Sequence, residues 1–169
     1  MDLETAIRAR RTHKQYGPDP VSEQVVRELV DLARLAPNHK LTNPWRFRLL
    51  GPETRARIDE LVPEAEVLKL RRAPTLVLAT AAVSEDPVLA GEDVQATAAA
   101  VQNMLLGATA RGLASYWRTP ACFQEDAVRR VLGLAANEVI VALVHLGPPA
   151  SDPPGKERAP VDDIFSTLP

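Results

Sequence analysis

The chain has 169 residues, of which 46% are hydrophobic and 25% charged, and its formal net charge is −2. A chain of this length fits one domain that buries a substantial core, and the near-zero net charge excludes a global field that would attract nucleic acid or a membrane surface. The single cysteine, Cys122, excludes an intramolecular disulfide and a cysteine-based metal cluster.

The N-terminal segment is acidic, and its apolar run is too short for a signal peptide. No stretch of the chain approaches the ~20 apolar residues that a membrane-spanning helix needs. Because a lone cysteine also suits a reducing compartment, the sequence predicts a soluble, cytoplasmic protein that forms one domain over residues 1–169. Neither nucleic acid nor a membrane is expected among its partners.

Hydrophobic periodicity predicts helices that alternate with four strands. Asp2 and Ser22 are the expected N-caps of the first two helices, and residues 64–72 are expected to be helical or irregular. No tight hairpin signal such as Asn-Gly occurs, so the sequence predicts an α/β or α+β domain with helices on both faces of one sheet. The expected helices span residues 3–11, 23–36, 53–62, 92–111 and 124–132, and the expected strands span residues 45–50, 73–81, 113–119 and 138–147.

The helix predicted over residues 92–111 is small or apolar nearly all round and ends at Gly112. A helix of this kind is buried, and its many alanines allow close backbone approach. In a chain this short, the surplus apolar face indicates a subunit interface in addition to a core.

Two polar segments are candidate binding elements. The segment from Ala36 to Phe47 crowds asparagines, a histidine and a lysine beside a tryptophan, which would suit a flat ligand with polar edges. The cluster from Arg8 to Lys14 follows the first helix, where cations complement the helix dipole by about 0.3–1 kcal/mol each. The alternative for this cluster is an anion pocket in which two arginines and the Thr12 hydroxyl hold a phosphate; spacing alone favours the helix-dipole interpretation by roughly two to one.

Common catalytic signatures are absent from the sequence. The chain has no G-x-G-x-x-G or P-loop motif, no G-x-S-x-G elbow and no histidine spacing that suits a metal. Cys122 and His145 are interpreted as core residues. The remaining polar clusters suit a phosphorylated aromatic cofactor whose own ring performs the reaction. They are Arg10–Thr12, His39–Trp45 and Trp117–Thr119, with Lys156 and Arg158 as a fourth.

Four motifs then stand in order along the chain: Arg10-Arg11-Thr12, Ala36-Pro37-Asn38-His39-Lys40 with Pro44-Trp45-Arg46-Phe47, Gln102-Asn103-Met104-Leu105-Leu106 with Gly112-Leu113, and Trp117-Arg118-Thr119. Each motif is weak alone. Their order and separations resemble those of the nitroreductase family of FMN-dependent oxidoreductases, in particular its compact single-domain bacterial branch. The resemblance covers nearly the whole chain.

The resemblance implies an α+β fold: a three-layer α/β/α sandwich with a central mixed sheet, assembled as an intertwined homodimer through the 94–110 helix. Two FMN molecules would bind at the subunit interface, each contacted by both chains. The resemblance places cofactor-binding roles on Arg10, Arg11, Thr12, Leu35, His39, Asn43, Trp117, Arg118, Thr119 and Arg158, with Lys156 as the alternative to Arg158.

Within that set, Arg10, Arg11 and Thr12 would bind the phosphate, as would Arg158 or Lys156. His39 would approach the cofactor from the other subunit, and residues 117–119 would hold the ribityl chain, the phosphate or the ring edge. Two residues depart from the family pattern. Asn43 stands where the family usually has Gln, which shortens the side chain beside the flavin, and Thr12 replaces Ser with its hydroxyl retained.

The implied activity is ping-pong hydride transfer through flavin N5, from NADH or NADPH to a nitroaromatic, quinone or related small-molecule acceptor. No protein residue is expected to be catalytic, because the flavin carries the chemistry. The alternatives are another reaction on the same fold (flavin fragmentation, dehalogenation or metabolite dehydrogenation) and a flavin-free binding module.

Overall fold

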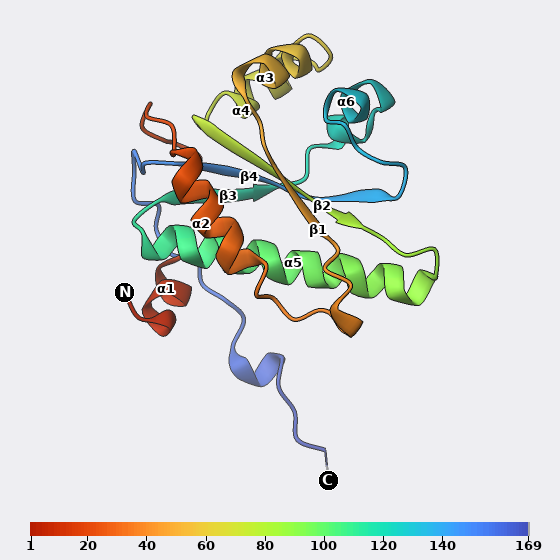
Figure 1. Cartoon of the computed structure of the whole chain (residues 1–169). Coiled ribbons are helices and arrows are strands. Elements are labelled where there is room, and N and C mark those ends of the chain that lie inside the picture. The colour runs from red at the N-terminus through yellow and green to blue at the C-terminus, as the bar shows by residue number, and fades with distance from the viewer. Residues whose placement is uncertain (169) are drawn as a thin grey trace.

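The computed structural model describes residues 1–168 and has a four-stranded sheet at its centre, in the order β1-β2-β4-β3 (Figure 1). The strands are β1 (Trp45–Leu49), β2 (Thr75–Ala82), β3 (Ala114–Arg118) and β4 (Glu138–Gly147). The continuously apolar β2 is central and buried along nearly its whole length, as predicted.

Helices flank this sheet, and the two predicted N-caps are confirmed. The Asp2 carboxylate accepts a hydrogen bond from the Thr5 N–H at 2.9 Å, and the Ser22 hydroxyl accepts one from the Val25 N–H at 3.3 Å. The helices are α1 (Leu3–Ala9), α2 (Glu23–Ala33), α3 (Pro52–Asp59), α4 (Glu64–Leu70), α5 (Pro87–Ala110) and α6 (Asp126–Val131), and the short 3-10 segments are His39–Leu41, Ala121–Gln124 and Val161–Asp163.

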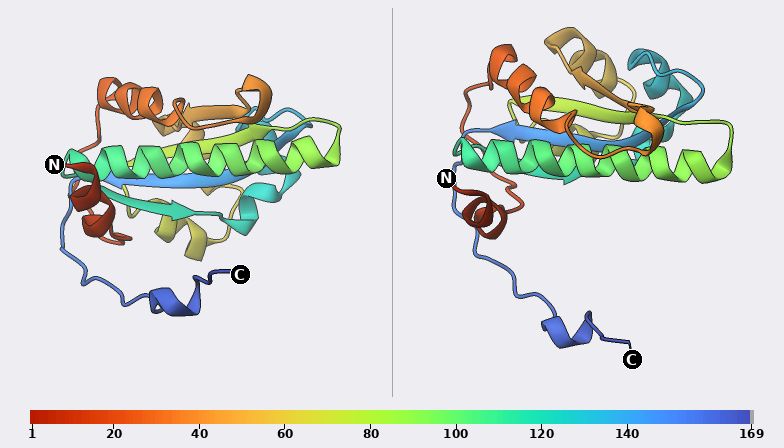
Figure 2. Two further views of the ribbon diagram at one scale, coloured as in Figure 1. Left: turned by 90° about the horizontal axis from the view of Figure 1, so that it is seen from below. Right: turned by 60° about the horizontal axis from the view of Figure 1, so that its bottom comes forward.

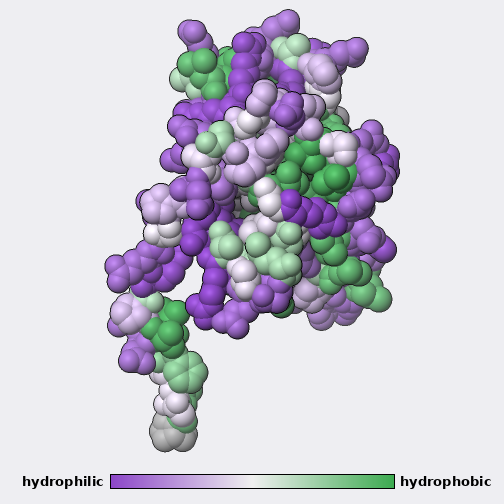
Figure 3. All heavy atoms as spheres, turned by 90° about the vertical axis from the view of Figure 1, so that its left-hand side faces the viewer, coloured by the Kyte–Doolittle hydropathy of each residue, from purple (hydrophilic) through white to green (hydrophobic). Residues whose placement is uncertain are grey.

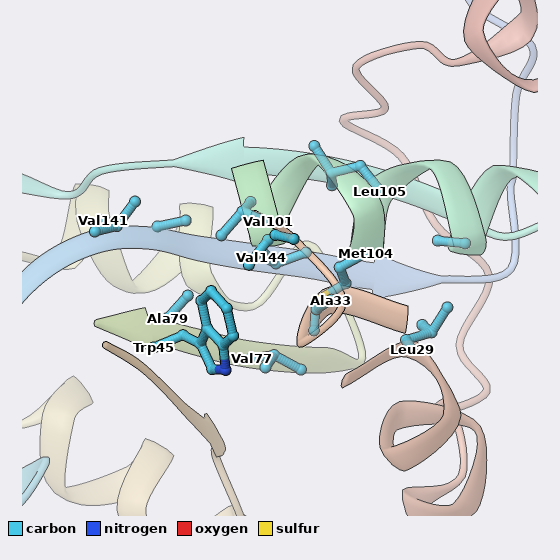
Figure 4. Close-up of a cluster of buried hydrophobic side chains, with 14 of the residues drawn as sticks. Leu29, Ala33, Trp45, Val77, Ala79, Val101, Met104, Leu105, Val141 and Val144 are labelled. Carbon is cyan, nitrogen blue, oxygen red and sulfur yellow. The ribbon is translucent and has the colours of Figure 1, made fainter. Parts of the chain in front are cut away.

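The helices form two layers, one on each face of the sheet (Figures 1 and 2). Because successive strand residues point to opposite faces, Val77 packs with Leu29 and Met104 of α2 and α5 (Figure 4). The neighbouring Leu76 packs in a second core with Ile58 of α3 and with residues of α6. The predicted α+β fold with three layers is confirmed.

The expectation of a mixed sheet is wrong for the single chain, because all three strand pairings are antiparallel. The reason lies in the connections. Residues 50–74 and 119–137 carry helices, yet Leu49 of β1 pairs with Val77 near the start of β2, and Arg118 of β3 pairs with Leu143 of β4. Each connection therefore returns the chain to the end of the sheet that it left, as a long hairpin does.

Helix α5 begins at Pro87, five residues before the predicted start, because Asp86 caps it. The Asp86 carboxylate accepts hydrogen bonds from the Val88 and Leu89 N–H groups. At the other end, Gly112 has a φ of +70°, which confirms its predicted role as the residue after the helix. Gly107 lets α2 approach closely, since a Cβ there would lie 2.8 Å from the Leu32 side chain.

After β4 the chain continues as a tail, residues 148–168, that projects from the body of the molecule (Figures 1 and 3). Its start is fixed to the N-terminal segment, because the Gly17 N–H donates to the Pro148 carbonyl at 2.9 Å. The far end carries the exposed apolar side chains of Ile164, Phe165 and Leu168. Between these two points, residues 153–158 of the tail lie beside the end of α1.

A partly buried ion pair links three strands of the sheet. Both terminal nitrogens of the Arg48 guanidinium on β1 donate to the Glu138 carboxylate on β4 at 2.7 Å, and the Thr80 hydroxyl of β2 donates to the same carboxylate. The Arg48 hydrogen bonds, with that from Thr80, lower the pKa of Glu138 to about 2. The charged carboxylate therefore stabilises the fold above the unfolded-state pKa near 4.5, and this stabilisation is lost as the pH falls from there towards 2.

We predict that Glu138→Gln lowers the free energy of unfolding at pH 7 by about 2–3 kcal/mol, because it leaves the Arg48 charge unpaired. The difference between the variant and the unchanged protein should shrink between pH 5 and pH 3. Urea unfolding at pH 7, pH 5 and pH 3 measures the difference in the free energy of unfolding. Glu85→Gln, at an exposed position, is the control. Equal stability of Glu138→Gln and the unchanged protein at pH 7 would contradict this account.

Candidate functional site

A cationic pocket of about 620 Å³ lies between the end of α1 and the C-terminal tail. Five of its lining residues are cations and none is a carboxylate. The structure thus brings together two clusters that are more than 140 positions apart in the sequence. The lining residues are Ile7, Arg8, Arg10, Arg11, Thr12, Pro153, Pro154, Gly155, Lys156 and Arg158.

Local backbone conformation sets the positions of the two central arginines. Arg10 leaves the helical conformation at the C-cap of α1, with ψ at 126°. The Arg11 guanidinium donates to the carbonyls of Arg8 and Arg10, the latter at 3.1 Å. Gly155 of the tail lies directly against this guanidinium, since a Cβ there would be 2.9 Å from Arg11 Nη2.

The cations of this pocket act on one another. Burial lowers the pKa of Arg10, and the charges of Arg158 and Arg11 lower it further. Among residues 1–168, the ion pairs include none that neutralises Arg10, Lys156 or Arg158. A phosphate group would relieve this repulsion by charge-assisted hydrogen bonds.

A second candidate region, the 38–43 loop, has a strained backbone. Lys40, Leu41 and Asn43 have φ values of +50°, +53° and +47°, a conformation that residues other than glycine seldom adopt. The Asn38 carboxamide oxygen accepts a hydrogen bond from the Asn43 N–H at 2.9 Å. Strain of this kind persists only where surrounding contacts enforce it, and it is concentrated at functional sites.

A buried carboxylate of α5 anchors this loop. Asp93 is 4% exposed, and one of its oxygens accepts from the Thr42 hydroxyl at 2.8 Å. Its other oxygen accepts from the Ser84 N–H at 3.1 Å. Sequence reasoning missed Asp93, because nothing in its local pattern distinguishes it from the other acidic residues of the chain.

Two polar residues at the end of β3 have internal partners, although Arg118 Nη1 is buried without one among the described residues. The Trp117 indole N–H donates to the Val141 carbonyl at 3.0 Å, and Arg118 donates to Glu66 of α4 at 2.8 Å. Hydrogen bonds from Lys69 and Arg118 lower the pKa of Glu66. Thr119 is exposed just beyond the strand.

The structure does not gather all the residues of the predicted cofactor set in one place. Arg10, Arg11, Thr12, Lys156 and Arg158 share the cationic pocket. The remaining members, Leu35, His39 and Asn43, lie in the segment between α2 and β1, and Trp117, Arg118 and Thr119 end β3.

The cationic pocket and the 38–43 loop lie at opposite ends of α5 (Figure 2). The N-terminal segment meets α5 near its end, where Ala9, His13 and Thr109 line one cavity. The loop meets α5 at Asp93. Residues 93 and 109 of one helix are about 24 Å apart along its axis, so a single chain keeps the cationic pocket and the 38–43 loop well apart.

Comparison with known proteins identifies the class. The model of the nitroreductase family matches residues 7–66 and 62–148, and the chain therefore belongs to the nitroreductase family. Within residues 1–168, no three His, Cys, Asp or Glu side chains are grouped so that they could hold a metal ion. No helix in that range is both long and apolar enough to cross a membrane.

Relatives of similar length cover nearly the whole chain. A Bacillus subtilis protein with the provisional name NAD(P)H nitroreductase YfhC is 28% identical over 98% of this chain and 94% of its own. A Thermus thermophilus protein named NADH dehydrogenase is 30% identical over 97% of this chain and 95% of its own.

Solved structures show the same fold. A nitroreductase-like family protein from Bacillus cereus has a TM-score of 0.88 at 24% identity, and covers 99% of this chain and 96% of its own. A provisionally named nitroreductase from Desulfovibrio desulfuricans, solved in complex with FMN, has a TM-score of 0.81 at 26% identity, with the same coverage.

Proposed function

We propose that this protein is an FMN-dependent oxidoreductase that takes electrons from NADH or NADPH and reduces small acceptors such as nitroaromatic compounds or quinones. The cationic pocket is the observation that carries the proposal. It offers a phosphate four arginines, a lysine and a hydroxyl, and no carboxylate in its lining competes for them. Family membership and the FMN complex of the Desulfovibrio relative support the same ligand.

The residues present fit the phosphate end of FMN. Guanidinium groups bind phosphate oxygens in pairs. Burial lowers the pKa of Arg10, and the charges of Arg158 and Arg11, which a dianion would balance, lower it further. Gly155 leaves room beside Arg11 that a side chain would fill. We assign Arg10, Arg11, Thr12 and Arg158 to the phosphate, with Lys156 as a further cation.

The separation of the two half-sites supports a homodimer. If a second copy packs along α5 in the opposite direction, the 38–43 loop of one chain lies beside the cationic pocket of the other. Leu35, His39 and Asn43 would then reach the cofactor from the partner. Leu106 of α5 is only partly buried and belongs to neither core of residues 1–168, which suits an apolar contact between copies.

FMN supplies the redox chemistry when bound, by accepting and donating hydride at its ring. The chain's own residues bind and orient it. The hydrogen bonds of Trp117 to the Val141 carbonyl and of Arg118 to Glu66 hold the end of β3. Thr119, the next residue, is thereby positioned to contact the cofactor. We expect the reaction to need no protein nucleophile, and we expect the enzyme to work in the cytoplasm.

We predict that Arg10→Ala and Arg158→Ala each weaken FMN binding about tenfold or more, because each removes a charge-assisted hydrogen bond to phosphate. Flavin fluorescence titration measures the dissociation constant. Arg57→Ala, an exposed cation on α3, is the matched control and should leave the constant unchanged. Unaltered FMN affinity in both pocket variants, with their thermal unfolding unchanged, would refute the phosphate assignment.

For the assembly, we expect light scattering to give twice the 18.4 kDa mass of one chain. Leu106→Glu should produce monomers, because it buries a charge between the two copies of α5. Leu68→Glu serves as control, since Leu68 is an exposed leucine of α4 on the other face of the sheet. A monomeric unchanged protein at micromolar concentration would contradict the dimer.

A further inference from the structure

The 38–43 loop has an unfavourable backbone conformation that brings no burial in return. Lys40, Leu41 and Asn43 have φ values between +47° and +53°, where the side chain of an L-residue crowds the carbonyl oxygen that follows it. All residues from His39 to Asn43 are exposed, and Leu41 is 76% exposed. Packing within one chain therefore does not account for the strain, and strain of this kind is concentrated at functional sites.

The side chains of Asn38 and Asn43 hold the backbone of this loop together. The Asn38 carboxamide oxygen accepts the Asn43 N–H at 2.9 Å, and its NH₂ donates to the Ala36 carbonyl at 3.4 Å. The Asn43 carboxamide NH₂ donates to the Leu41 carbonyl at 2.7 Å. Both side chains thus bond to the backbone of their own segment.

Asparagine suits the conformation that position 43 adopts. Together with aspartate and histidine, it enters the left-handed region several times more often than other residues with a side chain, because its short polar group can bond to nearby backbone. The bond from Asn43 to the Leu41 carbonyl is a contact of this kind. Glutamine, which the family usually has here, carries its carboxamide one methylene further out and lacks this preference.

We propose that Asn43 is a positioning residue, which fixes the left-handed conformation of the 38–43 loop and thereby the place from which His39 reaches the cofactor of the partner chain. The inference rests on the proposed function, which supplies FMN and the second chain. It assigns the Asn43 carboxamide to the Leu41 carbonyl and not to the flavin. Asn43 takes part in cofactor binding through the shape of its loop.

The hydrogen bonds of Thr42 connect Asn43 to His39. The Thr42 N–H donates to the His39 carbonyl at 3.2 Å, and the Thr42 hydroxyl donates to the buried Asp93 at 2.8 Å. Asn43 lies between Thr42 and β1, which begins at Trp45. A change of φ at Asn43 therefore alters how the strand joins Thr42, and with it the position of His39.

Replacing Asn43 by glycine and by glutamine separates loop shape from direct contact. Glycine has no side chain but adopts positive φ readily, whereas glutamine keeps a carboxamide and is disfavoured in that region. We expect Asn43→Gly to bind FMN within about threefold of the unchanged protein. Asn43→Gln and Asn43→Ala should bind it about tenfold more weakly, because their loops seldom adopt the binding conformation. Flavin fluorescence titration measures the dissociation constants.

Asn137→Ala is the matched control. Asn137 is exposed, and its carboxamide also donates to a backbone carbonyl, that of Val83 at 3.3 Å, but its φ is not positive. This variant should leave the FMN dissociation constant unchanged. Thermal unfolding of the flavin-free proteins checks that every variant folds, and we expect the midpoints to fall by no more than about 4 °C.

NMR of the flavin-free protein reads the loop conformation itself. A positive φ brings the N–H and Hα protons of one residue closer together than a negative φ does, so the NOE between them is strong. We expect strong NOEs within Lys40 and within Leu41 in the unchanged protein and in Asn43→Gly. They should be weaker in Asn43→Gln and Asn43→Ala.

The order of the variants decides the inference. If Asn43→Gln binds FMN at least as tightly as Asn43→Gly, the carboxamide contacts the cofactor directly and the inference is wrong. Strong NOEs at Lys40 and Leu41 that persist in Asn43→Gln and Asn43→Ala would also overturn it, since the loop would keep its shape without Asn43. An unchanged protein that binds no FMN would overturn the proposed function, and the NOEs of the flavin-free protein would then decide whether Asn43 shapes the loop.

Discussion

The packing of α5 across the sheet is the constraint on which the rest of the structure depends. Gly107 lets α2 approach the helix closely, and α5 buries many small side chains. Because α5 is continuous from Pro87 to Ala110, it separates the cationic pocket from the 38–43 loop by a fixed length. The proposed sharing of one cofactor between two chains rests on this separation and on the partly buried Leu106 of α5.

A gathering of unpaired cations distinguishes the cationic pocket from the rest of the molecule. Elsewhere, partly buried arginines have either an acidic partner, as in Arg48 with Glu138 and Arg118 with Glu66, or several backbone carbonyls, as in Arg55. Arg10 and Arg158 have none among the described residues, and their mutual repulsion contributes to the lowered pKa of Arg10. The fold therefore gathers several unpaired cations in this pocket, and an anionic ligand would balance their charge.

Local sequence signals predicted much of this molecule. The N-caps Asp2 and Ser22, the central strand β2 and all four strand positions follow from pattern and capping rules. What local pattern could not supply was contact between distant residues. The bond between Thr42 and Asp93 spans 51 positions, and the direction of strand pairing depends on how long connections cross the sheet. The cationic pocket was anticipated only in part, since spacing alone favoured the helix-dipole interpretation of Arg10 and Arg11.

A crystal structure of the FMN-loaded protein tests the central claim most directly, because the claim is that two chains share each cofactor. The account predicts an FMN phosphate in the cationic pocket, bonded to Arg10 and Arg158 of one chain, with the flavin ring beside the 38–43 loop of a second chain. An FMN molecule whose protein contacts all come from one chain, or whose phosphate lies outside the pocket between α1 and the tail, would contradict it.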